Sequence, residues 1–429
     1  MTRLPPLQFL LLLAGLLWLN LSSASGLGLK SLAELDVGQS LQLSGIPVGA
    51  ERLATVRFER IELYAPGAQI WRLDQSGRTP VQKTDRIWLM GYPVDDRSGR
   101  IALAANTDGS KWSGAVYGPD GLEVVRAYRQ HGTLRLRAYR PEALLPDRVT
   151  VENHCGNHAL TQIGESSHSL QSDSEPTAQR GDSLRFGVIG IDTDKEWLNK
   201  RFNDNTTAAA NWTEDLMLIS NTIFESDLNL RMLIGDTIYR VGSDPYSVGD
   251  NSVSQARLEE FGDYWDNNYS HFDRTHAALV SGRSESGFSA SGIAWVNSYC
   301  QTQAVGGSYS LNQLFHDSSV PTEISVRVFA HEIGHNLGSV HTHCYNPPVD
   351  HCFNNETGCY SGPVSCPNGG QGTLMSYCNV PAPNGANCGQ NQLSLAPEVA
   401  ALIGNRIEQN FPSCIFDEDD SIVFQDRFE

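Results

Sequence analysis

Five residues between positions 331 and 341 combine the side chains and the spacing of a catalytic zinc site. His331 and His335 are four residues apart, so on a helix they lie on one face, about 6 Å apart along the axis, and can reach one ion. Gly338 can adopt a left-handed conformation that ends the helix, which lets His341 return as a third ligand. Three nitrogen ligands leave a fourth position open, and a water there has its pKa lowered to about 7. Glu332, next to the first ligand, is placed to act as the general base.

A helix that begins near Thr322 is expected to carry these residues. Pro321 and Thr322 form a start signal, and one apolar stripe can pack on a sheet: Val326, Phe329, Ile333 and Leu337. If the histidines were ordinary core or surface residues, the five positions would match by chance, with odds of about one in ten thousand. His316, His343 and His351 lie nearby without ligand spacing, and we expect them to be polar surface residues.

Strands and helices alternate from residue 183 to residue 414, which predicts an α/β domain of about 230 residues. Strands are expected at 186–191, 228–234, 277–280 and 292–296, and a helix at 252–265. A longer helix follows the first strand, and its apolar face carries Trp212, Leu216, Ile219 and Ile223. A closing helix has apolar residues at four-residue steps: Val399, Ile403, Ile407 and Phe411. The chain has 429 residues, so a second folded unit is expected.

Residues 25–156 are predicted to form that second unit, a β-rich domain. They contain short alternating stretches such as 55–63 and 134–139, separated by Gly and Asp turn signals. Residues 157–182 turn to Ser, Gln and Glu with almost no large apolar side chains, which predicts a linker open to proteolysis, with Arg180 as one candidate cut site. Residues 415–429 are expected to form an acidic, solvated tail with a faint resemblance to C-terminal export tags of Gram-negative bacteria.

Charge divides the chain into two unlike halves. Residues 25–180 carry 18 basic and 18 acidic side chains, whereas residues 181–429 carry 12 basic and 31 acidic ones. The net charge of −18 disfavours a nucleic-acid binder, because a protein that neutralises phosphates needs a basic face. A content of 40% hydrophobic residues is typical of a globular protein and excludes disorder as the main state.

The N-terminus and the cysteines predict export. Arg3 precedes an apolar run from Leu7 to Leu19 that is shorter than a membrane span. We expect a signal peptide over residues 1–24, cleaved after Ala24, and the alternative is an uncleaved N-terminal anchor. Eight of the nine cysteines lie between positions 300 and 414, an even set that allows up to four disulfides with 105 connectivities.

The zinc motif has a family resemblance that extends beyond the helix. Residues 331–341, followed by the segment Thr373-Leu374-Met375-Ser376-Tyr377, resemble the metzincin signature with its Met-turn. Residues 183–414 are similar to the reprolysin (adamalysin, ADAM-like) branch of secreted zinc endopeptidases, as a bacterial member, although Thr342 stands where reprolysins usually have Asp. Residues 292–300 resemble the edge strand and the cysteine that precede the zinc helix.

The resemblance implies an α/β (α+β) metzincin catalytic domain with a substrate cleft above a smaller, disulfide-rich lower part. It implies that Cys300 pairs with Cys414 and that Met375 lies beneath the zinc as packing. Tyr377 would bind zinc or stabilise the oxyanion, as in serralysins and astacins, and the alternative is a packed aromatic residue. Calcium is common in such folds, but the sequence does not place its ligands.

Cys155, followed by Gly156, stands apart from the other cysteines at the end of the β-rich domain. A thiolate is a good fourth ligand for zinc, and in that position it would exclude the catalytic water. The segment resembles the cysteine switch of metzincin propeptides, which keeps the precursor latent until the propeptide is removed. The alternative is an unpaired or intermolecular thiol.

We therefore expect a secreted zinc metalloendopeptidase, a monomer made as a latent zymogen, that hydrolyses protein substrates. The strand near Ile293–Val296 would pair with an extended substrate by β-augmentation. One alternative is a catalytically silent adhesion or binding protein that retains the fold, and another is a zinc hydrolase that acts on something other than peptide. No segment after the N-terminus approaches the length of a membrane span.

Overall fold

In the computed structural model, the described residues are 34–49, 52–97, 99–107, 111–118, 121–131, 133–145, 152–156, 170–171, 183–249, 251–287 and 289–417. The expected signal peptide lies outside these residues, as do the linker apart from residues 170–171 and the tail after residue 417. The predictions for those segments therefore stay predictions.

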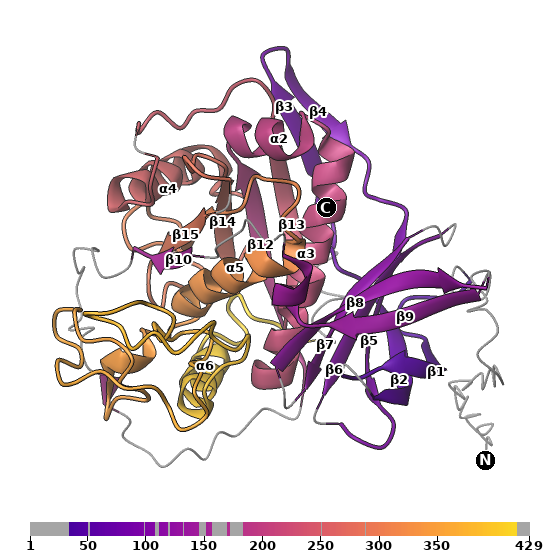
Figure 1. Ribbon diagram of the computed structural model, residues 1–429. Coiled ribbons are helices and arrows are strands. Elements are labelled where there is room, and N and C mark those ends of the chain that lie inside the picture. The colour runs from indigo at the N-terminus through magenta and orange to yellow at the C-terminus, as the bar shows by residue number, and fades with distance from the viewer. Residues whose placement is uncertain are drawn as a thin grey trace, which may run out of the picture.

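A seven-stranded antiparallel sheet forms most of the N-terminal part (Figure 1). Its strands, in sheet order, are β1 (Ser40–Pro47), β2 (Leu53–Ile61), β5 (Arg86–Pro93), β6 (Arg100–Asn106), β7 (Trp112–Gly118), β8 (Gly121–Gln130) and β9 (Thr133–Tyr139). Alternate side chains of a strand face opposite sides, and here both sides are buried. Leu89 and Leu103 belong to a core within the sheet, whereas Trp88 and Met90 join the large core shared with residues 183–417.

A second, mostly parallel sheet lies at the centre of the rest of the chain. Its strands from this part, in sheet order, are β15 (Ser289–Ala294), β16 (Tyr309–Gln313), β14 (His276–Ser281), β12 (Arg185–Thr193) and β13 (Leu230–Arg240). β15 runs antiparallel to β16, and the other three pairs are parallel. The structure therefore has strands in all four places where the apolar patterns predict them.

Helices cover both faces of this sheet. α3 (Thr206–Leu228) and α5 (Thr322–Asn336) share one core with the inner side chains of β12 and β14, and α4 (Gln255–Tyr269) packs on the opposite face. The alternation within β14 shows the two faces, because Ala278 and Val280 belong to the first core and Leu279 to the second. α6 (Pro397–Gln409) is the predicted closing helix, whereas α2 (Lys195–Phe202) and β16 were not predicted.

Three further strands of the central sheet come from the N-terminal part. β3 (Ile70–Asp74) pairs parallel with β13, β4 (Gly77–Val81) pairs antiparallel with β3, and β10 (Glu152–Cys155) pairs parallel with β15. These strands form both edges of an eight-stranded sheet, and Figure 1 shows the β3–β4 hairpin reaching across to it. The strand expected at 292–296 is β15, which ends at Ala294 and has β10 paired on its outer side in this structure. Its pairing with an extended substrate stays a prediction.

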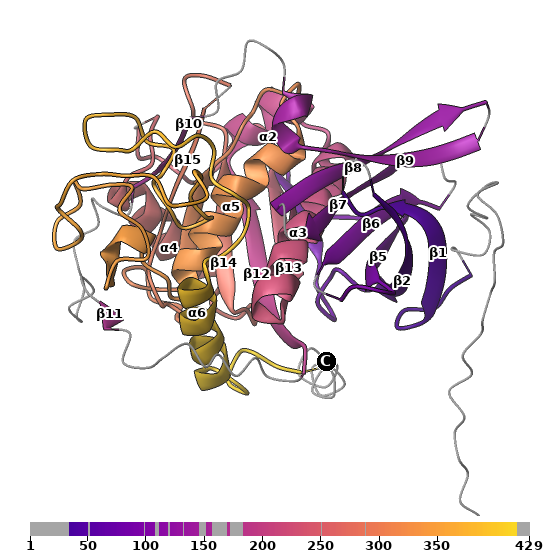
Figure 2. The same cartoon turned by 60° about the horizontal axis from the view of Figure 1, so that its bottom comes forward.

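Helix α3 lies between the two sheets (Figure 2), and its acidic residues bind the N-terminal part. The guanidinium of Arg86 donates to Glu214 at 3.2 Å and to Asp215 at 2.5 Å, and the Arg86 side chain is 4% exposed. The hydroxyl of Tyr64 also donates to Glu214, at 2.7 Å. Buried charges are costly unless they are paired, so this interface depends on both of its sides being present.

We expect Arg86→Ala to lower the free energy of unfolding by about 3–5 kcal/mol, because two acids of α3 lose their buried counter-charge. Urea unfolding followed by tryptophan fluorescence measures the change. The matched control is Arg52→Ala, which removes an ion pair with Asp96 whose side chains are 59% and 38% exposed, and which we expect to cost less than about 1 kcal/mol. Equal losses in the two variants would contradict the prediction.

The chain that follows α5 has little regular structure apart from α6 (Figure 1). Disulfides join its loops to one another. The four pairs are Cys300–Cys414, Cys344–Cys359, Cys352–Cys378 and Cys366–Cys388. The short elements of the structure are η1 (Pro141–Leu144), η3 (Thr342–Cys344), β11 (Leu170–Gln171) and β17 (Tyr345–Asn346), and the last two pair with each other. Four disulfides are compatible with an extracellular protein.

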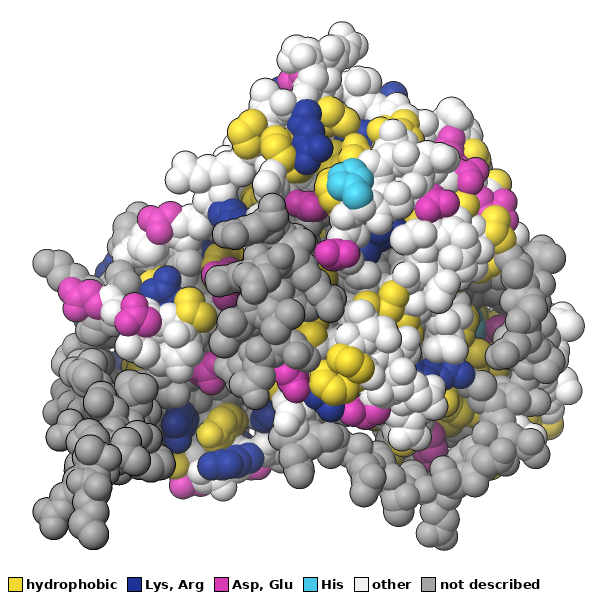
Figure 3. Space-filling view, turned by 180° about the vertical axis from the view of Figure 1, so that it is seen from behind, with side chains coloured by type: hydrophobic (Ala, Val, Ile, Leu, Met, Phe, Trp, Pro, Cys, Tyr) yellow, Lys and Arg dark blue, Asp and Glu magenta, His cyan; other side chains and the backbone are white. Residues whose placement is uncertain are grey.

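The first residues of the expected solvated tail are packed against the sheet. Ile415 and Phe416 are buried. Phe416 forms an isolated β-bridge with Phe186 of β12, and the two phenyl rings stack with their centroids 5.7 Å apart. Within the described part of the chain, none of the helices combines the length and the apolar character that crossing a membrane requires. Where residues are described on the face drawn in Figure 3, acidic and basic side chains are interspersed and hydrophobic side chains form small groups.

Candidate active site

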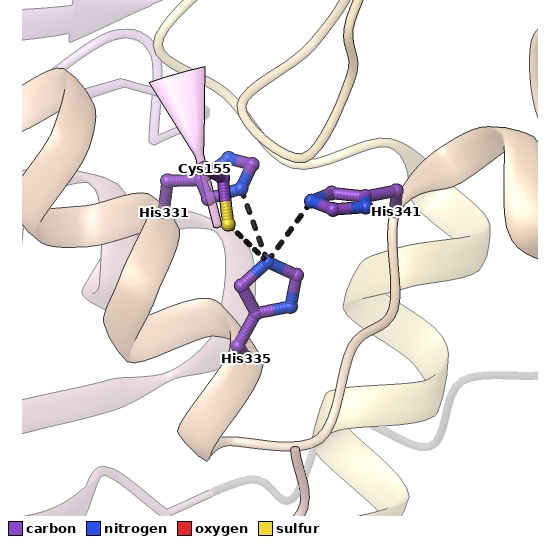
Figure 4. A group of neighbouring side chains, drawn as sticks. All are labelled: Cys155, His331, His335 and His341. Carbon is purple, nitrogen blue, oxygen red and sulfur yellow. Dashed lines mark hydrogen bonds between the residues drawn. The ribbon is translucent and has the colours of Figure 1, made fainter. Parts of the chain in front are cut away.

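The three histidines of the motif come together at the C-terminal end of α5 (Figure 4). The helix carries His331 and His335 one turn apart and ends at Asn336. Gly338, at a φ of +118°, then turns the chain so that His341 faces the other two rings. The Nε2 atom of His335 lies 3.1 Å from that of His331 and 3.2 Å from that of His341. The three ring nitrogens therefore surround one point.

Each ring is held by a hydrogen bond from its other nitrogen. His331 and His335 donate from Nδ1 to backbone carbonyl oxygens, each at 2.7 Å. His341 donates from Nδ1 to a carboxylate oxygen of Glu356 at 2.8 Å. Because a carbonyl and an ionised carboxylate only accept, the hydrogen-bond network assigns the proton of each ring to Nδ1. Each Nε2 is left with a lone pair, which is the form of histidine that binds a metal.

Cys155, at the end of β10, completes the group from the N-terminal part of the chain (Figure 4). Its Sγ lies 3.5 Å from Nε2 of His335 and 3.7 Å from Oε2 of Glu332. The side chain is buried and forms no disulfide. The four candidate ligand atoms of Cys155 and the three histidines all lie within 4.8 Å of one another.

The donor set and its spacing fit a zinc ion. Tetrahedral zinc, with bonds of about 2.0–2.1 Å to nitrogen and about 2.3 Å to sulfur, places two nitrogens roughly 3.3 Å apart and a sulfur roughly 3.6 Å from a nitrogen. The distances here are 3.1 and 3.2 Å between nitrogens and 3.5 Å from sulfur to nitrogen. Burial, aided by the neighbouring rings, lowers the pKa of His331 to about 3 and that of His335 well below its usual value. The lone pairs of the three Nε2 atoms converge and repel one another, and a cation between them removes that repulsion.

Glu332 follows the first histidine on α5 and points toward Cys155. It is 1% exposed, and burial raises its pKa well above the usual value. Its Oε1 has no hydrogen-bond partner among the described residues. The side chain lies directly against Gly292 of β15, where an added Cβ would collide with it. A buried carboxyl group beside a metal-binding cluster is a candidate general base, and this role of Glu332 stays a prediction.

The turn at Leu374–Met375 supports the histidines from below. The carbonyl oxygen of Leu374 accepts the hydrogen bond from His331. Met375 is fully buried against Gly334 of α5, where an added Cβ would lie 2.6 Å from the methionine sulfur. The sulfur therefore packs on the helix backbone between the two helical histidines.

Tyr377 lies at the same site and is engaged with the N-terminal part. Its hydroxyl donates to the carbonyl oxygen of Cys155 at 2.7 Å, and its ring centroid lies 4.2 Å from that of His341. Burial raises the pKa of Tyr377 well above 10, so the hydroxyl keeps its proton. Its roles as a zinc ligand, an oxyanion donor or a packed aromatic residue stay predictions.

The comparisons with known proteins concern the part of the chain that holds these residues. Residues 183–389 match the family model Reprolysin_5, described as metallo-peptidase family M12. This match supports a metallopeptidase. Among solved structures, metalloproteinase-II from Bacteroides fragilis is similar at 13% identity and a TM-score of 0.36, over 73% of this chain and 84% of that one. No curated protein sequence matches the chain.

Little space remains beside the three histidines in this structure. A cavity of about 30 Å³ is lined by residues that include Cys155, His331, Glu332 and Tyr377. That volume holds one or two water molecules but no extended peptide. Cys155 of β10 is one of the residues that line it.

His343 corrects one prediction about the candidate site. It was expected at the surface, but it is completely buried and donates from Nε2 to Glu356 at 2.8 Å. His316 is half-buried and His351 is exposed. No spacing rule identifies His343 or Glu356, because the two residues meet only after the loop between them has folded.

Proposed function

We propose that the chain is a secreted zinc metalloendopeptidase of the reprolysin-like branch of the metzincins, from a bacterium, made as a latent precursor. One observation carries the proposal: the converging Nε2 atoms of His331, His335 and His341, with the buried carboxyl of Glu332 beside them. The match of residues 183–389 to a metallopeptidase family supports peptide hydrolysis over other zinc chemistry. The four disulfides are compatible with export through the expected signal peptide, residues 1–24.

The three histidines would hold the zinc. Bound there, zinc polarises the scissile carbonyl and lowers the pKa of a bound water. Glu332 would take a proton from the attacking water on its unpartnered oxygen and pass it to the leaving amine. Tyr377, once released from the carbonyl of Cys155, would donate its hydroxyl proton to the oxyanion. Met375 would fix the helix that carries two of the ligands.

Latency would come from residues 25–156. Cys155 would supply the fourth zinc ligand, and β10 would occupy the outer side of β15. Cleavage in residues 157–182 and loss of β10 would open both places, so that an extended substrate pairs with β15 in its stead. The mature catalytic domain would then begin near residue 183.

Metal removal tests the function. The processed protein is expected to cleave denatured casein, to fall to background activity with a zinc chelator, and to recover when zinc is added back. Sequencing of the mature N-terminus should place it between Cys155 and Phe186. A processed protein that holds zinc but cleaves no protein substrate would favour the silent adhesion or binding protein. Hydrolysis of non-peptide substrates alone would favour another class of zinc hydrolase.

A further inference from the structure

The three candidate zinc ligands are not anchored in the same way. His331 and His335 donate to backbone carbonyl oxygens, which no substitution of a side chain removes. His341 donates instead to the side chain of Glu356, fifteen residues further along the chain. His341 also lies outside α5, so the helix does not fix its position. The third ligand therefore depends on one carboxylate.

That carboxylate is itself held from a second side. The same Oε2 atom of Glu356 accepts the Nε2 proton of His343 at 2.8 Å, and the side chain of Glu356 is 10% exposed. The rings of His341 and His343 stack with centroids 5.5 Å apart and an interplanar angle of 8°. Glu356 thus accepts hydrogen bonds from two imidazole rings that lie nearly parallel. One belongs to the candidate ligand His341 and the other to the buried His343.

The loop that carries Glu356 is tied to the short helix η3, which carries His343. The disulfide Cys344–Cys359 joins the residue after His343 to a residue three positions after Glu356. The amide of Tyr360 also donates to the carbonyl oxygen of His343 at 3.0 Å. Both ties hold the carboxylate near the two rings before any metal binds, which lowers the entropic cost of ordering the site.

We propose that Glu356, held by His343, is the positioning residue of the third zinc ligand. By accepting the Nδ1 proton it fixes the tautomer and the orientation of His341, and its negative charge makes the Nε2 atom a better donor to the cation. This inference rests on the zinc site of the proposed function. Partners of this kind typically change metal affinity by about 10- to 100-fold.

The test measures the zinc affinity of the full-length chain by competition with a chromogenic chelator. We expect Glu356→Ala to raise the zinc dissociation constant by about 10- to 100-fold. Glu356→Gln, which keeps an accepting oxygen but loses the charge, is expected to fall between wild type and Glu356→Ala. With cobalt(II) in place of zinc, the visible absorption bands should shift in both variants, because the third ligand is reoriented.

Asp350→Asn is the matched control. Asp350 is a buried carboxylate of the same region that accepts from the amide of Cys352 at 3.0 Å and from the hydroxyl of Ser376 at 2.7 Å. It accepts no hydrogen bond from a candidate ligand, so its loss should lower the melting temperature and leave the zinc dissociation constant unchanged. Circular dichroism shows whether each variant is folded. If Glu356→Ala is not, the zinc affinity of Glu356→Gln alone decides the test.

The outcomes separate this inference from the proposed function. If wild type binds one zinc and both Glu356 variants bind it as tightly, or if Asp350→Asn weakens binding as much, the positioning role is overturned and the zinc site stands. If the wild-type chain itself binds no zinc, the proposed function fails and this inference fails with it.

Discussion

Glu332→Gln is expected to lower kcat of the processed protein by about 10²- to 10⁴-fold while about one zinc per chain remains bound. The amide has the size of the carboxyl group, so it fits the narrow space against Gly292. It cannot take up a proton, so the attacking water loses its base. The ligand nitrogens belong to other residues, so the metal has no reason to leave. Casein cleavage and metal analysis of the same preparation measure both effects.

The control for this substitution is Glu323→Gln on the same helix. Glu323 is also buried, but it lies in the first turn of α5 and pairs with Arg126 of the N-terminal part. That partner is absent from the processed protein, so we expect kcat to stay near the wild-type value. If Glu332→Gln retained full activity, or if it lost its zinc along with the activity, Glu332 would not be the general base.

Cys155→Ala is expected to raise the activity of the uncut chain on a short peptide by on the order of tenfold or more. The thiol would no longer compete with water and substrate for the fourth zinc position. A tenfold gain in activity corresponds to a free energy of about 1.4 kcal/mol for that competition. The gain should stay below the activity of the processed protein, because β10 remains paired with β15 and the amide of Gly156 still donates to the carbonyl of Gly292 at 2.7 Å. The hydroxyl of Tyr377 also stays engaged with the carbonyl of residue 155.

Processing supplies an internal control for the cysteine. Once the segment that contains residue 155 has been removed, wild type and Cys155→Ala are the same molecule and should have equal activity. If uncut Cys155→Ala were as inactive as the uncut wild type, the prediction would be contradicted. That result would show that the backbone of β10 blocks the site without help from the thiol.

The spacing of the histidines made the core of the site predictable, because a helix and one glycine turn translate sequence distance directly into spatial distance. The same reasoning missed β16, a strand of five residues in which Tyr309 and Leu311 alternate with polar residues that are also buried, Ser310 and Asn312. It also failed for α2, whose eight residues are too few for a clear periodicity. Long apolar stretches such as β12 and α3 were found because their patterns are strong.

The sequence also did not predict which segments that are distant in the chain contact each other. Alternation predicts that a segment is a strand, but it does not say that β3 joins β13 or that β10 joins β15, since those contacts close loops of more than 100 residues. The contact between Glu356 and His343 spans only 13 residues, but it depends on how the irregular loop between them folds, which no periodicity predicts. The pairing of Cys300 with Cys414 was implied by the family resemblance and not by the residues alone.

In the proposed precursor, the β3–β4 hairpin and β10 would give the N-terminal part a role during synthesis. A chain that started at residue 183 would have to fold with the outer backbone groups of β13 and β15 unpaired, and such open edges join strands of other chains. In the proposed precursor, the N-terminal part of the same polypeptide would be made first and would cover both edges as the catalytic domain folds. Cleavage within residues 157–182 would remove this cover only after the sheet has formed. The mature enzyme would then persist because unfolding is slow, while refolding of the isolated domain would compete with aggregation.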